Sequence, residues 1–453
     1  RLLQYKPFLR FCQRKRRAAQ GFVREIIDFS AWICYNRVYL ISFPGIGAIN
    51  MKYVIILGDG MADIPVDSLG GKTPLEAAFK PNTDSLAPVS VIGNVNTVPE
   101  GMVPESDTAN LAVMGYDPRL YSKGRSPLEA ASMGIKMRDD ETAIRANIVS
   151  LAGEGSYEDL IMADHSSDEI PTREARILID DIQKRFGSDT LRFYCGVSYR
   201  HCLIWKNCPE FTDFSRPHDI IGRRIGEYLP ASAQSRPMRE LMEKSYYFLN
   251  SHPLNIERAA RGLKKANSLW LWSPGKKPSL PSFSEKTGLK GSVVCAVDLI
   301  KGIGFCAGMS VPDVNGATGT LDTDYAAKCV AAIKELENGS QLVYIHVEAP
   351  DECGHRGETE NKVKSIEYID KYIVGGMLGY LRGSGEHFRM LILPDHPTPL
   401  SVRTHTRAPV PFLLYDSQQD AAGADSYSEA AGMRGISLAR GEMLMDMLTE
   451  AKR

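Results

Sequence analysis

Three short apolar runs, each followed by acids or histidines, constrain the fold of this chain more than any other feature. They are residues 52–57 (KYVIIL), 342–347 (LVYIHV) and 388–393 (FRMLIL). Such runs are typical of parallel strands that a sheet buries on both faces. Helices expected at 325–336 and 361–378 alternate with the strands, and this alternation favours an α/β fold with a doubly wound sheet.

The side chains that follow these three runs have the chemistry of a metal site. They are Asp59, the pair Asp351 and His355, the adjacent pair Asp395 and His396, and His405 one loop later. Each could singly be a turn or capping residue, but the carboxyl ends of parallel strands meet at one edge, where ligands bind. Acids and imidazoles without thiolates suit Mn²⁺, Mg²⁺ or Zn²⁺. Six such groups exceed what one small ion needs, which predicts two metals of the kind used for phosphoryl displacement.

Residues 98–118, VPEGMVPESDTANLAVMGYDP, are predicted to present Ser106 at the start of a short helix. Acids flank the serine on both sides, and the proline and glycine before it indicate an irregular backbone. The N-terminus of a helix favours an anion there. One alternative is that Ser106 only caps the helix. The other is that it is a nucleophile, since a serine on a metal ion loses its proton readily.

The middle of the chain lacks the continuous apolar runs of the three strands above and is predicted to form an inserted domain. We expect the α/β domain to comprise residues 51–127 and 283–453, with a smaller α/β insertion at 128–282. The Pro-, Lys- and Ser-rich stretch 275–284 is expected to be a linker. In the insertion we expect helices at 126–133, 172–185 and 254–263 and strands at 143–149 and within 191–203. The run 409–415 is expected to be the last strand.

Composition excludes several classes of function. The 54 Lys and Arg nearly balance the 55 Asp and Glu, so the formal net charge of −1 does not indicate a nucleic-acid partner. No apolar run reaches membrane-spanning length. The nine cysteines are scattered without a CxxC pair, which suits a reducing cytoplasm.

Residues 1–50 do not match the rest of the chain, because nine Lys and Arg stand there against two Asp and Glu. We expect this basic N-terminal extension to lie outside the fold, as translated sequence upstream of a start at Met51. The alternative interpretation is a transit or signal segment.

Several long strings identify a known family. The chain resembles the cofactor-independent phosphoglycerate mutases of the archaeal-type branch, within the alkaline-phosphatase superfamily. The resemblance runs from about Met51 to the C-terminus and rests on GDGMAD, PESDTANLAVMGYDP, GRSPLEAASMG, DLIKGIG, GATGTLDTDY, HVEAPDECGH and PDHPTP with RTHT. It implies an alkaline-phosphatase-like sheet with helices on both faces.

The resemblance also implies a role for each candidate residue. Ser106 matches the serine that is transiently phosphorylated, and Lys301 a lysine that stabilises the transferring charge. One metal is assigned to Asp59, Ser106, Asp395 and His396. The other is assigned to Asp351, His355 and His405. Arg145, Arg200 and His201 are our candidates for binding the substrate, since arginine suits a carboxylate or phosphate; surface strand residues are the alternative.

The function that follows is interconversion of 2-phosphoglycerate and 3-phosphoglycerate through phosphoserine. It implies two divalent ions, Mn²⁺ first and Mg²⁺, Zn²⁺ or Co²⁺ as alternatives, and no 2,3-bisphosphoglycerate. The partner is a small phosphorylated three-carbon acid, and the enzyme is expected to be a cytoplasmic monomer or small homo-oligomer. Where the family often shows WGQG, this chain has Trp272-Ser273-Pro274-Gly275. Because of this departure, a phosphotransferase acting on homoserine or another small alcohol is the alternative function. A third hypothesis, a binding protein without activity, predicts that a metal-ligating residue or the serine is missing, and none is.

Overall fold

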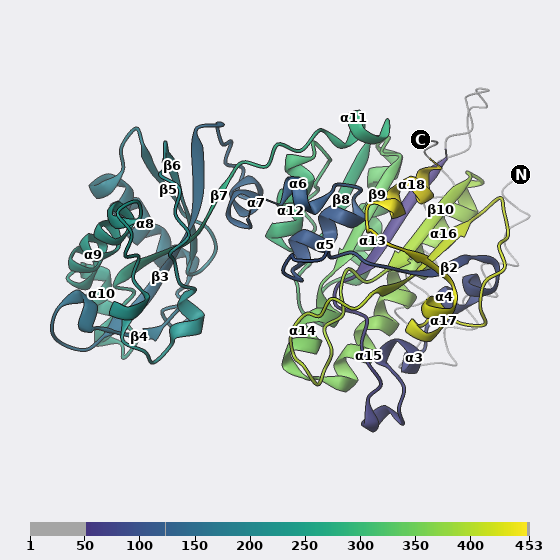
Figure 1. The fold of residues 1–453 in the computed structure, drawn as a ribbon, viewed down its shortest axis with the longest axis horizontal. Helices are drawn as coiled ribbons and strands as arrows, with labels where there is room; N and C mark the ends of the chain where they lie inside the picture. Colours follow the sequence, from purple (N-terminus) through teal and green to yellow (C-terminus); the bar gives the residue numbers. More distant parts are fainter. Residues whose placement is uncertain (1–50, 123, 451–453) are drawn as a thin grey trace, which may run out of the picture. The chain divides into compact units, whose positions relative to one another are not determined.

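The computed structural model describes residues 51–122 and 124–450, so the prediction made for residues 1–50 lies outside the described residues. In the described part, a first sheet has seven strands in the order β12-β2-β11-β10-β1-β9-β8 (Figure 1). The strands are β1 (Lys52–Gly58), β2 (Val91–Val95), β8 (Gly291–Val294), β9 (Leu342–Val347), β10 (Phe388–Leu393), β11 (Val410–Asp416) and β12 (Ile436–Leu438). β8, β9, β1 and β10 are parallel, whereas β11 runs antiparallel to both β10 and β2.

The three strands singled out by the sequence are direct neighbours. β1 pairs with β9 on one side and with β10 on the other, and Leu57 is level with His346 and Leu393. All three strands therefore end together. The residues that follow them share one edge of the sheet, as predicted.

Helices cover both faces of this sheet. Val54 and Ile56 pack into one apolar cluster, and Ile55 and Leu57 into another on the opposite face, as the alternation of a strand requires. This arrangement confirms the predicted α/β fold. The first face packs against α3 (Pro74–Ala77), α4 (Pro81–Leu86), α13 (Tyr325–Glu337), α15 (Thr359–Tyr368), α16 (Gly375–Ser384) and α17 (Glu429–Arg434). The second packs against α5 (Ser106–Val113), α7 (Ser126–Ser132), α11 (Phe283–Thr287), α12 (Asp298–Cys306) and α18 (Met443–Thr449).

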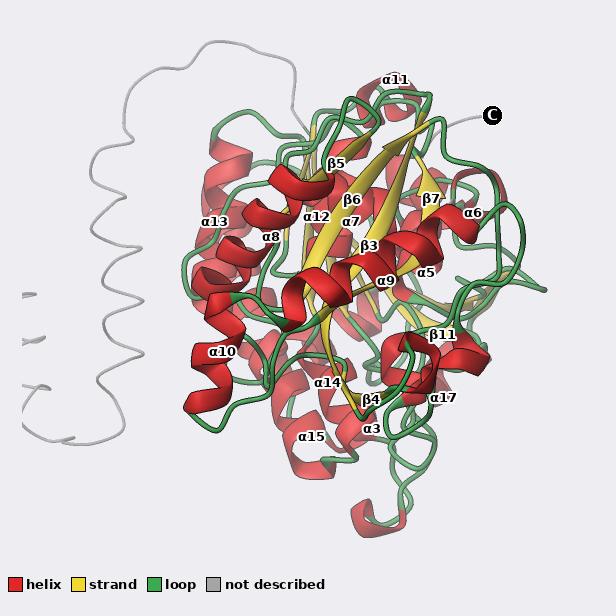
Figure 2. Cartoon of the chain, turned by 90° about the vertical axis from the view of Figure 1, so that its left-hand side faces the viewer, coloured by secondary structure: helices red, strands yellow, loops and turns green. Residues whose placement is uncertain are grey.

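A second sheet is built within the stretch that the sequence assigns to the insertion. Its strands are β3 (Glu141–Ala152), β4 (Ile161–Asp164), β5 (Leu191–Tyr194), β6 (Arg200–Lys206) and β7 (Ser268–Lys276). Two long helices, α8 (Thr172–Phe186) and α9 (Arg236–Asn250), lie across these strands (Figure 2) and share one apolar cluster with them. The helix α10 (Pro253–Ala260) follows α9. The boundaries at 127/128 and 282/283 stay predictions.

Some elements differ from the sequence prediction. The helix α9 was not predicted, and β12 follows the strand that we expected to be last. The strand β7 continues to Lys276, so the predicted linker begins two residues later than expected and ends where α11 starts. The reason is that β7 pairs with β3 alone, at an edge where a proline costs no ladder hydrogen bond, and the register shifts beside it.

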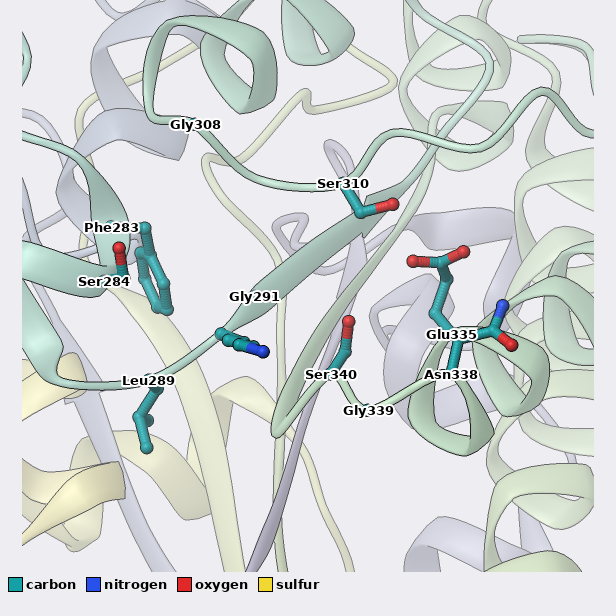
Figure 3. Close-up of a pocket in the computed structure, with 11 residues that line it drawn as sticks. Phe283, Ser284, Leu289, Gly291, Gly308, Ser310, Glu335, Asn338, Gly339 and Ser340 are labelled. Atoms are coloured by element: carbon teal, nitrogen blue, oxygen red, sulfur yellow. The ribbon is translucent and has the colours of Figure 1, made fainter.

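A cavity of about 420 Å³ lies at the amino ends of the strands, opposite the edge that carries the acids and histidines. Gly291 at the start of β8 and the end of α13 border it, with Lys290 and Glu335 among its polar groups (Figure 3). It offers no second group of metal donors among the described residues. Among those residues, no helix has the length and apolar character needed to cross a membrane.

Candidate active site

The turn after β1 places Asp59 at the carboxyl edge of the sheet, where its side chain is 2% exposed. Gly60 follows with φ +59°, and its N–H donates to Oδ1 of Asp395 over 3.1 Å. A Cβ at Gly60 would lie 2.6 Å from both Oδ1 of Asp351 and Oγ1 of Thr398. Only glycine therefore allows the three loops to converge here.

Asp395 is held by three donors besides the turn after β1. Nδ2 of Asn110 donates to Oδ2 over 2.8 Å, the His396 N–H donates to Oδ1 over 2.8 Å, and the Thr97 hydroxyl donates to the backbone carbonyl over 2.5 Å. These bonds fix the carboxylate next to Asp59, which lies 3.5 Å from Nε2 of His396.

Ser106 is the first residue of α5, and Glu105 takes the N-cap position without a side-chain capping bond. The serine hydroxyl therefore does not cap its helix. Instead, Oγ lies 3.3 Å from Nε2 of His396, and Nδ2 of Asn110 donates to the Ser106 carbonyl over 2.8 Å. This places the hydroxyl at a helix N-terminus and in hydrogen-bond contact with one of the candidate metal ligands.

The second group of donors comes from α14 (Ala349–Arg356) and the loop after β10. Oδ2 of Asp351 lies 3.2 Å from Nε2 of His355, as the i, i+4 spacing on a helix allows, and Oδ1 lies 3.5 Å from Nε2 of His405. The Thr398 hydroxyl donates to Asp351 as well. The His405 ring stacks on His396 at 4.0 Å between centroids, so the two groups adjoin.

The two histidines of this group have the tautomers that a cation requires. Nδ1 of His405 is 2.8 Å from the Pro104 carbonyl, and Nδ1 of His355 is 3.0 Å from the Arg403 carbonyl. A carbonyl only accepts, so each Nδ1 carries a proton. In the neutral rings both lone pairs then lie on Nε2, and these two atoms face each other over 2.9 Å. A cation between the two Nε2 atoms would remove the repulsion between their lone pairs. This arrangement fits two metal-ligating histidines that are each oriented by a backbone carbonyl at Nδ1.

One further donor escaped sequence reasoning. His346, in β9 and fully buried, places Nε2 3.1 Å from Oδ2 of Asp59. The donor atoms of Asp59, His346 and Asp395 all lie within 4.8 Å of one another, as do those of Asp351, His396 and His405. A lone histidine inside an apolar strand was the signal in the sequence, and His396 lies with the second group as well as beside the first.

Charge in this site is unbalanced, because carboxylates are buried together. Burial and then the charge of Asp395 raise the pKa of Asp59 well above its usual value. Burial acts in the same direction on Asp351, but hydrogen bonds from His355 and His405, made when these rings also carry a proton on Nε2, hold the pKa of that carboxyl well below its usual value. A cation beside Asp59 would offset the repulsion, so the donor set fits a divalent metal ion.

Two lysines approach this edge of the sheet from helices. Lys301 lies on α12, one-fifth exposed, with Nζ 3.4 Å from Oδ1 of Asp313. Lys328 on α13 is fully buried and donates to the His346 carbonyl over 3.0 Å. Burial lowers the pKa of Lys328 to about 8. The sequence pointed to Lys301 only, because Lys328 sits in an ordinary amphipathic helix.

The three candidate substrate residues do not lie together. Arg145 on β3 pairs with Glu129, with Nε 2.7 Å from Oε2, and its guanidinium lies 4.4 Å from the ring centre of Trp272. Arg200 is exposed at the start of β6. His201 is level with Ala146, one residue along from Arg145, so it points to the opposite face of the sheet, towards the apolar cluster under α8 and α9.

The family departure at Trp272-Ser273-Pro274-Gly275 has a structural counterpart. Ser273 has φ +51°, a conformation that favours glycine, and it stands where the family often has glycine. The Ser126 hydroxyl donates to the Ser273 carbonyl, and the Trp272 indole N–H donates to Oδ1 of Asn147 over 3.1 Å. The backbone path is thus held by hydrogen bonds on both sides.

Fold and site together define a class of protein. A doubly wound α/β sheet carries nitrogen and oxygen donors at the carboxyl edge of its parallel strands, with a serine hydroxyl among them. These are the features of a metal-dependent enzyme that transfers phosphoryl groups.

Comparison with known proteins gives the family. The family model described as 2,3-bisphosphoglycerate-independent phosphoglycerate mutase matches residues 87–255. A probable mutase of this name from Geobacter sulfurreducens is 47% identical over 402 residues, covering 88% of this chain and 100% of the relative. The mutase from Methanothrix thermoacetophila is 46% identical over 385 residues, covering 85% and 96%. The chain belongs to the 2,3-bisphosphoglycerate-independent phosphoglycerate mutases.

Two solved structures resemble this chain over most of its length. A cofactor-independent phosphoglycerate mutase from Thermoplasma acidophilum is 25% identical with a TM-score of 0.62, covering 88% of this chain and 99% of that one. A protein from Pyrococcus horikoshii is 27% identical with a TM-score of 0.74, covering 90% and 99%.

Proposed function

We propose that this enzyme interconverts 2-phosphoglycerate and 3-phosphoglycerate through a phosphoserine at Ser106, without 2,3-bisphosphoglycerate. The observation that carries the proposal is the serine hydroxyl at the start of α5, 3.3 Å from Nε2 of His396 and not engaged in capping. The relatives from Geobacter sulfurreducens and Methanothrix thermoacetophila are named as phosphoglycerate mutases that are independent of 2,3-bisphosphoglycerate.

The proposal includes two divalent metal ions, with Mn²⁺ first and Mg²⁺, Zn²⁺ or Co²⁺ as alternatives. One would be held by Asp59, Asp395 and His396 together with Ser106, with His346 as an additional donor. The other would be held by Asp351, His355 and His405. When bound, such ions polarise phosphoryl oxygens and lower the pKa of a coordinated hydroxyl.

The chain's own residues then carry out two matched transfers. Oγ of Ser106 gives up its proton and forms a bond to phosphorus while the bond from phosphorus to the substrate oxygen breaks, and that oxygen takes up a proton. The glycerate stays bound and presents its other hydroxyl, which gives up a proton and attacks phosphorus while the bond from phosphorus to Oγ breaks, and Oγ takes up a proton again. The Lys301 ammonium stabilises the charge on the phosphoryl oxygens.

Substrate binding is proposed for the arginines of the inserted sheet. Arg145 and Arg200 have guanidinium groups suited to a carboxylate. For His201 the buried position favours a supporting role under the strand that carries Arg200, rather than direct contact. Arg216 joins this set, because Nη2 lies 3.4 Å from Oε1 of Glu105, the residue before Ser106.

The test is an enolase-coupled assay of the purified chain with 3-phosphoglycerate and no 2,3-bisphosphoglycerate. The protein is stripped of metal and then given Mn²⁺. Activity that returns with the metal supports the proposal, and metal-bound protein that stays inactive overturns it. Homoserine, offered with a phosphoryl donor, tests the alternative, since a transferase forms product only when the acceptor is supplied.

The domain boundaries, a cytoplasmic location and a monomeric or small homo-oligomeric state stay proposals from the sequence. Truncation at Met51 tests the first of these. A fully active enzyme lacking residues 1–50 would show that these residues are dispensable for catalysis.

A further inference from the structure

The carboxylate of Glu105 lies between two arginines, immediately before Ser106. Oε1 is 3.4 Å from Nη2 of Arg216, and Oε2 is 3.9 Å from Nη1 of Arg125. Glu105 is the N-cap residue of α5, yet its side chain makes no capping bond. Both guanidinium groups therefore lie at the start of α5, the helix that carries the proposed nucleophile Ser106.

Arg125 is poorly partnered for a residue in this position. Its Nε is buried and has no hydrogen-bond partner among residues 51–122 and 124–450. The distance of 3.9 Å to Glu105 allows an ion pair but no hydrogen bond. A buried N–H without an acceptor is costly, so such a group calls for an explanation, and a catalytic role is one of those known.

The surroundings of Arg125 are rich in acids of the site. Glu105, the residue before Ser106, forms the ion pair with Arg125. Glu348 follows β9, where burial raises its pKa to about 8 and the positive charge of Arg125 opposes that rise. The guanidinium thus lies beside the residue that precedes Ser106 and acts on an acid at the end of a central strand.

We propose that Arg125 contacts the phosphoryl group as it passes to and from Ser106, an inference that rests on the proposed function. The transferring group spreads negative charge over three oxygens, and a planar guanidinium fork matches two of them. Glu105 holds the fork loosely until the phosphoryl arrives. Arg125 keeps its protons throughout; the bonds that form and break are those between phosphorus, Oγ of Ser106 and the substrate oxygen.

The experiment compares Arg125→Ala, Arg125→Gln and Arg125→Lys with the wild type in the Mn²⁺-loaded full chain. The substrate is 3-phosphoglycerate, and the readouts are kcat, KM, phosphoserine at Ser106 in quenched samples, metal content and Tm. The matched control is Arg119→Ala, since Arg119 is half exposed and pairs with Asp117 on the surface.

Arg125→Ala is expected to lower kcat by about 10²–10³-fold, as loss of one preorganised donor does. KM, metal content and Tm should change much less. Guanidinium ion at millimolar, non-denaturing concentration should restore part of the activity of Arg125→Ala and leave Arg119→Ala unchanged. Arg125→Lys should lie between, because it keeps the charge and loses the fork.

Activity of Arg125→Ala within threefold of the wild type would overturn the inference. So would losses in all three variants that follow Tm or metal content and are not rescued by guanidinium. In both cases wild-type activity leaves the proposed function standing. An inactive wild type, or an active Ser106→Ala variant, would instead reject the proposed function itself.

Discussion

The hydroxyl of Ser106 lies 3.3 Å from Nε2 of His396, across 290 residues of sequence. The contact exists because α5 packs on the face of the sheet whose edge carries the loop after β10. Asn110, one turn along α5, donates to both the Ser106 carbonyl and Asp395, which locks the helix start against that loop. The position of this hydroxyl, the proposed nucleophile, is therefore set by the helix rather than by a flexible loop.

Replacing Ser106 by alanine should abolish mutase activity, because in the described residues Ser106 supplies the hydroxyl beside Nε2 of His396, whereas the Thr398 hydroxyl lies at the other ring nitrogen, Nδ1, over 3.3 Å. Metal content should stay near that of the wild type, since the acids and histidines remain. The coupled assay measures the first quantity and elemental analysis of desalted protein the second. Ser251→Ala, at an exposed serine with hydrogen bonds of 3.5 Å, is the control and should remain active.

Stability should depend on metal concentration. Asp59, Asp351 and Asp395 are buried close together. A cation that binds only the folded state stabilises that state, and the gain grows with the logarithm of the cation concentration. At a concentration of 100 times Kd the gain is about 2.7 kcal/mol. A chelator should lower Tm, and added Mn²⁺ should raise it again. Asp395→Asn should reduce that rise; a Tm of the wild type that ignores Mn²⁺ would contradict the metal assignment.

Gly60 and Gly70 provide a matched pair of substitutions. Both have positive φ, +59° and +68°, but a Cβ at Gly60 would meet Asp351 and Thr398 at 2.6 Å, whereas Gly70 has nothing within 4 Å. Gly70→Ala should lower the free energy of unfolding only by the cost of holding an alanine in the left-handed backbone conformation, about 1–2 kcal/mol. Gly60→Ala should cost more and also weaken Mn²⁺ binding. Equal losses of stability with equal Mn²⁺ affinity in the two variants would refute this reading of the turn.

Residues at strand ends were predictable from sequence, because their position needs only the strands to be found. Asp59, Asp351 and Asp395 follow continuous apolar runs, and the parallel pairing of β1, β9 and β10 brings them together. Ser106 was located by its flanking acids and by the helix after it. The sequence left open whether Ser106 caps the helix or acts as a nucleophile; the structure places Glu105, not Ser106, at the N-cap position of α5, and the role of nucleophile stays a proposal.

The roles of residues within strands and helices were harder to predict from the sequence, because these roles depend on strand register and packing. His346 reads as one more strand position until β1 places Asp59 beside it. His201 and Arg145 looked equivalent in sequence, yet the pairing of β3 with β6 turns them to opposite faces. The stretch 275–284 was predicted to be a linker, but β7 continues through Pro274 to Lys276, because an edge position tolerates a proline in a strand.

The ion pair between Lys362 and Asp63 should contribute strongly to stability. Nζ lies 2.7 Å from Oδ2, and both side chains are fully buried. Lys362→Met would leave the carboxylate buried without its partner, at a cost of about 3–5 kcal/mol in the free energy of unfolding. Urea unfolding with Mn²⁺ present measures this loss.

Two further variants test the origin of that loss. Lys364→Met, at an exposed lysine on the same helix, should change stability by less than about 0.5 kcal/mol. Asp63→Asn combined with Lys362→Met should recover part of the loss, because the uncompensated charge is gone. A single Lys362 variant that unfolds like the Lys364 variant would contradict the prediction.

His201 should make stability depend on pH in a defined window. Burial lowers its pKa to about 3 in the folded state, and its Nδ1 accepts from the Gly196 N–H over 3.2 Å. The usual value near 6.5 applies to the unfolded chain. Between about pH 3 and 6.5 the unfolded chain therefore binds a proton that the folded chain does not, so this residue's contribution to stability rises with pH across the window and is constant above it.

His201→Gln removes that titration, so the variant should lose stability at pH 7 and lose less, or none, at pH 5. The difference between the two pH values should be about 2 kcal/mol, from about 1.36 kcal/mol for each pH unit below 6.5. Urea unfolding of both proteins at each pH measures it, and the acids of the metal site cancel because both proteins contain them. The same wild-type advantage at pH 5 and pH 7 would show that His201 is charged or accessible in the fold, and would reopen a direct role for its ring in binding substrate.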